Sequence, residues 1–241
     1  MRRILCILGA AALLGACNSF KTDCYVSDFS YPVGDGGDTL FARVSLEYPV
    51  RGMEEPAMEA VKESIATIAF DMEGMEFTSL EETAAIYEAD LIDEFVTESE
   101  SSLGRGNLVW EDVVEGYYVE PYKKYRCYII SYYSYRGGPH GLSTLTALVL
   151  DSDGNILPEG ALIRDDARDA VASLIRTHLL EQDSTLADYV EDEYVGPNGN
   201  FLFRKDGVEW FYQPMEVAPA SLGILSSLVP WAELKPYLLV Y

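Results

Sequence analysis

The order of its periodic segments is the feature that most limits the folds open to this chain of 241 residues. Alternating residues predict strands from Cys24 to Tyr48. Apolar residues spaced three and four apart then predict helices over 56–72 and 79–95, and a hairpin follows over 110–135. Because strands and helices are grouped instead of strictly alternated, this order predicts an α+β fold with antiparallel sheets and packed helices.

The last part of the chain repeats the mixture of strands and helices on a smaller scale. A strand over 143–150 leads into an Asp-Gly turn, a helix spans 168–180, and a short closing helix opens at Val229. The predicted organisation is therefore two closely associated α+β subdomains, which comprise residues 24–142 and 143–241.

The first 23 residues predict export and lipid anchoring. Ile4–Ala16 is an uncharged apolar run of 13 residues, which is too short to span a membrane but typical of a secretory signal. It ends in Leu-Gly-Ala-Cys, and small residues before a cysteine resemble the lipobox of bacterial lipoproteins. We expect residues 1–16 to be removed, Cys17 to be acylated, and 17–23 to form a short tether. The alternative is ordinary secretion with Cys17 as a free thiol.

The mature chain is strongly acidic. Removal of residues 1–16 takes away two arginines and no acidic residue, so the net charge changes from −23 to −25. Phosphate backbones require a basic face, so nucleic acid is not an expected partner. The residues after Cys17 resemble neither an inner-membrane retention signal nor an acidic surface-export signal. This favours the bacterial cell envelope, at the periplasmic face of an outer membrane.

Two cysteines, Cys24 and Cys127, are left outside the leader and the lipidation site. An exported protein can form disulfides, and a bridge between these residues would close a loop of about 100 residues. In the chain-entropy model such a bridge contributes about 4–5 kcal/mol. The alternative is two buried free thiols on strands, which packing alone would explain.

Signatures of catalysis and of cofactor binding are missing from the sequence. It has no G-x-S-x-G, H-E-x-x-H or C-x-x-C pattern, so we predict no catalytic residue, metal or cofactor. His140 lies in a Gly-Gly-Pro-His-Gly turn, where a structural role is favoured over a catalytic one. Asp151, Asp153 and Asn155 lack the spacing of an EF-hand loop and predict a tight turn instead.

Eight of the 17 tyrosines fall between positions 117 and 135. Alternation along a strand divides them between two faces, so one set is expected in the core and the other in part exposed. Exposed tyrosines stack on sugars or anchor protein interfaces, which is the alternative to core packing. The candidate binding residues are Tyr133, Tyr135, Arg136 and His140.

A set of short motifs in the second half of the chain resembles a known family. Residues 133–141 (Y-S-Y-R-G-G-P-H-G) are similar to the Tyr-x-Gly-Gly-Ala-His turn of the extracellular domain shared by RsiV-type anti-sigma factors, some peptidoglycan deacetylases and many bacterial lipoproteins. The Asn-Phe strand at 200–203, the segment at 212–219 and the closing run at 229–234 also resemble this family.

The resemblance implies an α+β envelope domain, with lysozyme sensing known for the anti-sigma members. Two positions depart from the family pattern, because Pro139 stands where Ala is usual and Met215 replaces the usual Tyr. We expect a non-enzymatic, membrane-tethered protein that binds lysozyme or another cationic protein, or else peptidoglycan. The alternatives are a cell-wall glycan hydrolase or deacetylase that uses His140, and an envelope scaffold without a small ligand.

Overall fold

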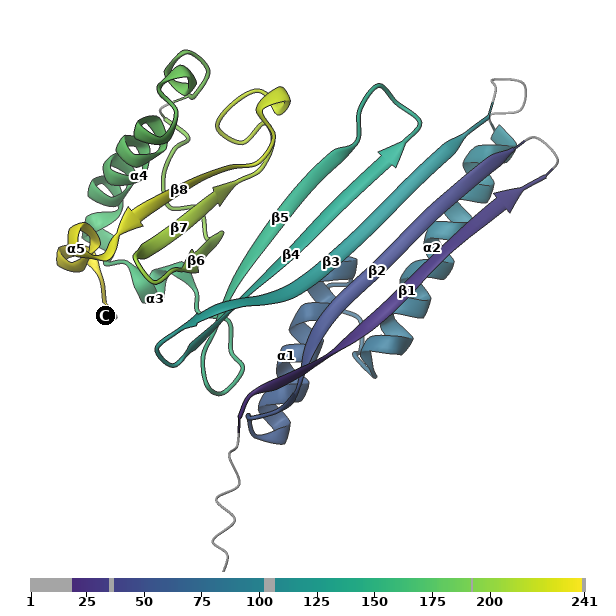
Figure 1. Ribbon diagram of the computed structural model, residues 1–241, viewed down its shortest axis with the longest axis horizontal. Helices are drawn as coiled ribbons and strands as arrows, with labels where there is room; N and C mark the ends of the chain where they lie inside the picture. Colours follow the sequence, from purple (N-terminus) through teal and green to yellow (C-terminus); the bar gives the residue numbers. More distant parts are fainter. Residues whose placement is uncertain (1–18, 35–36, 102–106, 192, 240–241) are drawn as a thin grey trace, which may run out of the picture.

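The computed structural model describes residues 19–34, 37–101, 107–191 and 193–239. It has a five-stranded sheet backed by two long helices and, beside it, a three-stranded sheet with shorter helices (Figure 1). The predicted α+β class is confirmed. The predicted leader and the lipidation site, Cys17, lie outside the described residues.

The strands of the first sheet lie in chain order. They are β1 (Lys21–Val33), β2 (Asp38–Arg51), β3 (Val109–Tyr122), β4 (Tyr125–Arg136) and β5 (Leu142–Leu150). The β1–β2, β3–β4 and β4–β5 pairs are antiparallel, as predicted. β2 and β3 are parallel, which differs from the predicted antiparallel pattern. The reason is the helical segment between them, since a parallel pair requires a long crossover.

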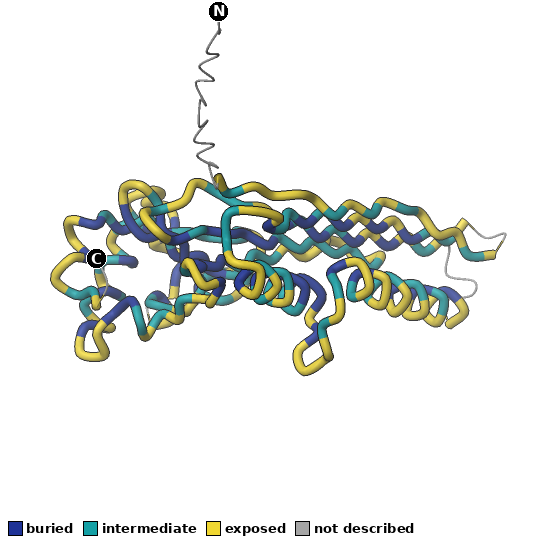
Figure 2. The backbone as a smooth tube through the Cα atoms, turned by 90° about the horizontal axis from the view of Figure 1, so that it is seen from below, coloured by how far each residue is buried: buried dark blue, intermediate teal, exposed yellow. Residues whose placement is uncertain are grey.

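The helices of this crossover, α1 (Glu55–Phe70) and α2 (Leu80–Ser101), both cover one face of the sheet (Figure 2). Their inner stripes are buried, as the three- and four-residue spacing predicts. α2 begins after Ser79, whose hydroxyl accepts a hydrogen bond from the Glu82 amide at 3.1 Å. Among the described residues, no helix combines the length and apolarity needed to cross a membrane.

The rest of the chain forms the antiparallel β6-β7-β8 sheet and its covering helices. The elements are α3 (Glu159–Leu162), η1 (Asp165–Ala167), α4 (Arg168–Gln182), η2 (Ser184–Asp188), β6 (Phe201–Phe203), β7 (Gly207–Tyr212), η3 (Ala220–Leu222), β8 (Leu225–Pro230), α5 (Trp231–Leu234) and η4 (Lys235–Tyr237). The closing helix was expected from Val229, but that residue belongs to β8. The Asp-Gly turn is followed by a single antiparallel bridge between Leu150 and Ile156.

The two parts of the fold share the strands β4 and β5, whose residues 127–130 and 147–150 are buried on both faces. Cys127 and Val149 join the core of the second sheet, whereas their neighbours Tyr128 and Leu148 join the core under α1. β5 pairs with β4 and therefore extends the first sheet to Leu150, beyond the expected boundary between 142 and 143.

Two side-chain amides join the second part of the fold to the edge of β5. Asn200 accepts a hydrogen bond from the Ala147 amide at 2.7 Å and donates to the Leu145 carbonyl at 2.8 Å. Gln213 accepts from the Leu145 amide at 3.0 Å and donates to the same carbonyl at 2.6 Å. These bonds occupy edge groups that would otherwise lack a partner.

Cys24 and Cys127 are both free thiols in the structure, so the possible bridge between them is not formed. Cys24 is exposed on β1, whereas Cys127 is buried on β4 and donates a hydrogen bond to the Phe203 carbonyl at 3.4 Å. Three strand spacings of about 4.8 Å separate β1 from β4. A bridge needs Cα atoms within about 7 Å, so this topology excludes it.

Candidate functional site

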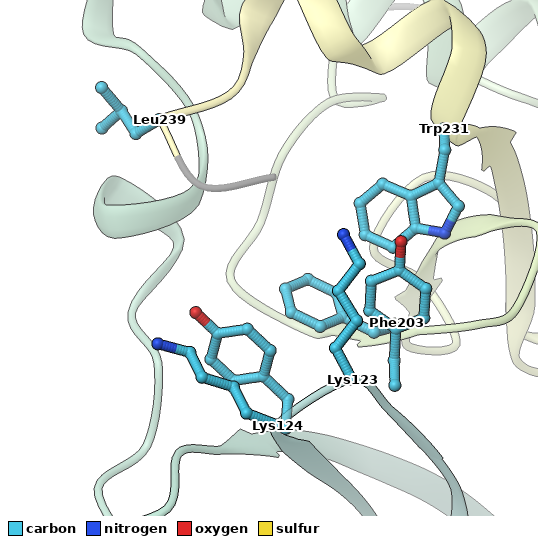
Figure 3. A pocket seen from close by; sticks show the side chains of 7 residues that line it. Lys123, Lys124, Phe203, Trp231 and Leu239 are labelled. Carbon is cyan, nitrogen blue, oxygen red and sulfur yellow. The ribbon is translucent and has the colours of Figure 1, made fainter.

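The turn between β3 and β4 closes one side of an aromatic hollow of about 510 Å³ (Figure 3). Its floor holds Phe203 and Trp231, both of which are buried. Tyr122 stacks on Trp231 with ring centroids 4.6 Å apart, and Lys123 and Lys124 form the rim. This hollow therefore combines an apolar floor with a basic edge.

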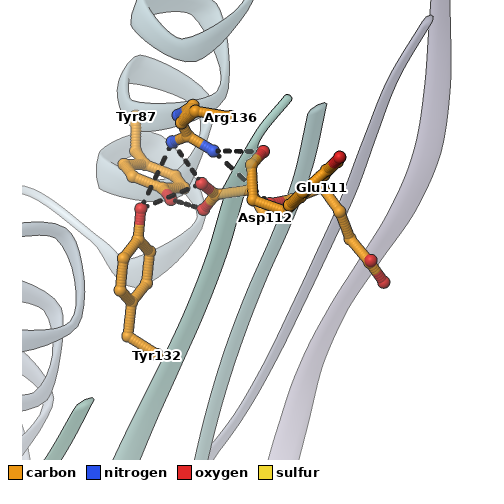
Figure 4. A network of polar contacts seen from close by, with 6 residues as sticks. Tyr87, Glu111, Asp112, Tyr132 and Arg136 are labelled. Carbon is orange, nitrogen blue, oxygen red and sulfur yellow. Dashed lines mark hydrogen bonds and ion pairs between the residues drawn. The ribbon is translucent and has the colours of Figure 1, made fainter. Parts of the chain in front are cut away.

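The other end of these strands carries a buried carboxylate. It belongs to Asp112 of β3, a residue that is 1% exposed. It faces the helix-covered side of the sheet and accepts hydrogen bonds from three side chains (Figure 4). The donors are the Tyr87 hydroxyl from α2, the Tyr132 hydroxyl from β4 at 2.9 Å, and Nη2 of Arg136 at 2.5 Å. The ion pair and the two hydroxyls offset the desolvation of the buried charge.

The protonation states in this network follow from burial and from the charge of Asp112. Burial, followed by the negative charge of Asp112, raises the pKa of Tyr87 and the pKa of Tyr132, so both remain neutral donors. For Arg136, burial acts to lower the pKa, but the hydrogen bond and charge of Asp112 raise it above its usual value. The guanidinium also lies over the Trp110 ring, with Cζ 4.5 Å from its centroid.

A groove of about 380 Å³ opens above this network, at the junction of α1 and α2. Tyr87, Tyr132 and Arg136 line it together with apolar side chains, among them Phe70, Met72, Met75 and Leu91. Four exposed carboxylates also line it: Asp71, Glu73, Asp90 and Glu94. We call this site the acidic groove.

The acidic groove suits a cationic side chain with an apolar stem. Methylenes of a lysine or arginine can pack on its floor, where Met75 is 52% exposed, while the charged head meets the carboxylates. The positive charge of Arg136 is balanced by Asp112, so it does not cancel the acidic character of the rim. Asp112 itself accepts three hydrogen bonds and is removed from solvent, which fits structural support better than proton transfer.

The structure does not bring the four predicted binding residues together. Arg136 lines the acidic groove, but Tyr133 and Tyr135 lie on the opposite face of β4, because their positions alternate with those of Tyr132 and Arg136. The Tyr133 ring covers Gly141, where an added Cβ would meet it at 2.3 Å. A larger residue at position 141 would therefore displace the Tyr133 ring.

His140 is exposed in the turn after β4. No hydrogen bond or ion pair joins the His140 side chain to any other described residue. A catalytic imidazole needs a carboxylate or a nucleophile within hydrogen-bond reach, and His140 has neither among the described residues. Within the same described ranges, no cluster of three or more His, Cys, Asp or Glu residues has an arrangement that could hold a metal ion. Asp151 forms the predicted tight turn by accepting bonds from the amides of Asp153 and Asn155.

The sequence analysis predicted neither Asp112, which lies at the centre of the network, nor the acidic groove above it. The available signal was the alternation of β3, where Asp112 shares a face with the apolar residues Trp110 and Val114. Asp90 and Glu94 are exposed residues of α2. Their proximity to the end of α1 depends on the packing of two helices, which no local pattern encodes.

Comparisons with known proteins find one family to which the second part of the chain is similar. Residues 160–232 match the family described as "Protein of unknown function (DUF3298)". A solved structure of a DUF3298 family member from Bacteroides fragilis is 19% identical, with a TM-score of 0.79 over 92% of this chain and 94% of that one. A DUF3298 family protein from Pseudomonas aeruginosa is 15% identical, with a TM-score of 0.64 over 91% of this chain and 94% of that one. A comparison with curated proteins found no match.

These matches agree with the family resemblance at the level of DUF3298. At such low identity the solved structures establish the shared fold alone.

Proposed function

We propose that this protein is a lipid-anchored component of the bacterial envelope that binds a cationic protein through the acidic groove. The observation that carries the proposal is the set of four exposed carboxylates around an apolar floor. The net charge of −25 that the chain has after removal of residues 1–16 adds a long-range attraction for basic partners. The RsiV-type resemblance makes lysozyme, a strongly basic protein, the first partner to test.

The buried network supports this proposal by fixing the base of the groove. Tyr87 and Arg136 come from different elements, and both are held by Asp112, so α2 and β4 keep a constant separation there. A preformed groove binds with less loss of conformational entropy than a flexible one. Specific recognition of a partner's lysine or arginine would then depend on the carboxylates of the rim.

The membrane attachment rests on the sequence Leu14-Gly15-Ala16-Cys17. The first strand, β1, begins at Lys21, only four positions after Cys17. An acyl anchor there would hold the folded part close to the bilayer, on the periplasmic face of the outer membrane. Replacing Cys17 by serine is expected to abolish incorporation of labelled fatty acid and to release the protein from the membrane fraction.

The groove is tested by two variants with the same change in charge. Glu73→Gln, Asp90→Asn and Glu94→Gln together remove three carboxylates from the acidic groove. The control removes three exposed carboxylates from the second part of the fold through the replacements Asp165→Asn, Asp188→Asn and Glu193→Gln. Calorimetric titration with lysozyme at low salt measures the affinity of each protein.

We expect the groove variant to bind about tenfold more weakly than the unmodified protein, because each lost charge contact contributes about 0.5 kcal/mol. The control is expected to lose less than threefold. Equal losses in both variants would mean that net charge alone attracts the partner, and the assignment to the groove would be wrong.

A further inference from the structure

One edge of the first sheet, along β1, pairs with no other strand (Figure 1). β1 pairs with β2 along its whole length, and no backbone hydrogen bond from another described segment reaches its outer edge. The opposite edge of the sheet differs, because Asn200 and Gln213 occupy backbone groups of Leu145 and Ala147 on β5. The described chain therefore covers part of one edge and leaves the other open to a further strand.

Two hydrogen bonds identify the amides of β1 that point outward. The Cys24 amide donates to the Asp23 carboxylate at 2.8 Å, so it does not join the ladder with β2. Near the other end of β1, Pro32 pairs with Thr39, whose amide donates away from β1 to the Leu108 carbonyl. Both observations assign the same alternating set of residues to the outer edge. The members of this set between Cys24 and Pro32 are Val26, Asp28 and Ser30.

The outward set is accessible from solvent. Val26 is 60% exposed, and Asp28 and Ser30 are exposed as well. The alternate residues Tyr25 and Phe29 pack against the cores under α1 and α2, on the other face of the sheet. An added strand could therefore approach residues 26–30 without displacing a core side chain. We call residues 26–30 the open edge.

Acidic side chains of α2 lie beside the open edge. Burial raises the pKa of Tyr25, and the charges of Glu88 and Glu81 raise it further, which places both carboxylates near β1. Neither carboxylate makes an ion pair with a described residue. Oε1 of Glu88 is buried and has no hydrogen-bond partner in the described part of the chain. A positive group beside β1 would supply the missing donor.

The basic residues around this edge do not compensate these two carboxylates. Arg43 lies directly opposite Asp28 and balances that charge. Lys62 has an ion pair within its own helix, α1, at 2.7 Å. Lys21 and Arg51 pair with each other in the ladder before the open edge begins. A second copy of this chain would bring a further net charge of at least −23, so repulsion opposes pairing between copies.

We propose that the open edge accepts an extended basic segment of a partner protein as an additional antiparallel strand. In this mode of recognition, main-chain hydrogen bonds give affinity and alternate side chains give specificity. Lysine or arginine at every second position of the segment would lie on the side of Glu81 and Glu88. The residues between them would lie beside Val26 and turn their amides toward β1. The open edge shares no residue with the acidic groove, so this is a second interaction surface.

The probe is a capped peptide, Thr-Lys-Val-Lys-Val-Lys-Thr, which is added to the full chain. Its matched control carries N-methyl groups on both valine amides, so it keeps every charge but cannot donate hydrogen bonds toward β1. Residue-resolved hydrogen exchange of the Val26, Asp28 and Ser30 amides reports occupation of the open edge. The amides of Tyr25 and Phe29 point toward β2 and serve as the internal reference.

We expect the saturating peptide to slow exchange of the three outward amides at least fivefold and to leave the reference amides unchanged. The N-methylated peptide should have no such effect. Val26→Pro removes one outward amide, and Pro32 shows that this set of positions accommodates proline. This variant should bind the peptide at least tenfold more weakly, whereas Val26→Thr, which keeps the amide, should bind it as the parent does. Circular dichroism melting curves verify that both variants fold.

Equal slowing by the N-methylated peptide, or unchanged binding by a folded Val26→Pro variant, would overturn the proposal, because charge alone would then hold the peptide. If that variant fails to fold, the comparison of the two peptides on the unmodified chain decides. Protection confined to the acidic groove would also overturn it. So would slowing of the outward amides without peptide as protein concentration rises, since the edge would then take a second copy. Lysozyme titration of Val26→Pro tests the proposed function separately.

Discussion

Replacing Asp112 by asparagine tests whether the buried network holds the acidic groove together. The substitution keeps the shape of the side chain but removes its charge and turns one acceptor oxygen into a donor. Tyr87 and Tyr132 can rotate their hydroxyls toward the new acceptor, but the Arg136 guanidinium carries donors only. The main loss is therefore the ion pair of Asp112 with Arg136.

The size of this loss depends on the access of water to Arg136. Breaking a fully buried ion pair by removing one partner costs about 3–5 kcal/mol. The Arg136 side chain is 34% exposed, so water can replace part of the interaction, and we expect a decrease of about 2–3 kcal/mol in the free energy of unfolding. For a protein of this size that corresponds to a fall of roughly 4–12 °C in melting temperature.

Urea unfolding followed by circular dichroism measures the effect. Glu111→Gln is the matched control, because Glu111 is the preceding residue on β3 and its side chain is exposed on the opposite face. It should change stability by less than about 0.5 kcal/mol. A change of that small size for Asp112→Asn as well would refute the view that this carboxylate stabilises the fold.

Three further outcomes follow from other contacts. Asn200→Ala should cost about 1–3 kcal/mol in the free energy of unfolding and speed hydrogen exchange in β5, since the Ala147 amide loses its partner while the Leu145 carbonyl keeps its bond from Gln213; unchanged exchange there would contradict this. Burial raises the pKa of Tyr87 and Tyr128, so the folded state retains protons that the unfolded state releases above pH about 10. Stability should then fall with rising pH by about 1.4 kcal/mol per unit for each tyrosine, and pH-independent unfolding between pH 10 and 11 would be inconsistent with it. Cys24 should react at once with a thiol reagent, whereas Cys127, whose pKa is raised to about 11 by burial, should react only after denaturation; immediate labelling of both would show the burial to be wrong.

Local periodicity was sufficient to predict the helices and most strands of this fold. The stripe that includes Val61 and Ile65 is buried in α1, and the hairpin of β3 and β4 lies where alternation placed it. The parallel pairing of β2 with β3 was not predictable in the same way, because it joins strands separated by two helices. The free state of Cys24 and Cys127 depends on that same strand order.

The candidate site was predicted less well than the fold. Arg136 was found because it belongs to a recognisable turn motif, but its neighbours Tyr133 and Tyr135 lie on the other face of the strand. The partner of Arg136 is Asp112, which is 24 positions away and is brought near by strand register. Register and helix packing are set by the whole core, so single motifs identify members of the site without its geometry.

The central claim is tested most directly by calorimetric titration of the protein with lysozyme at low ionic strength and again at physiological salt. A succinylated lysozyme, which has the same scaffold but negative groups in place of its lysine charges, serves as the comparison. The account predicts a complex with native lysozyme whose affinity falls as salt screens the charges, and no complex with the succinylated form. The absence of heat with native lysozyme at low salt, or equal binding of both forms, would contradict it.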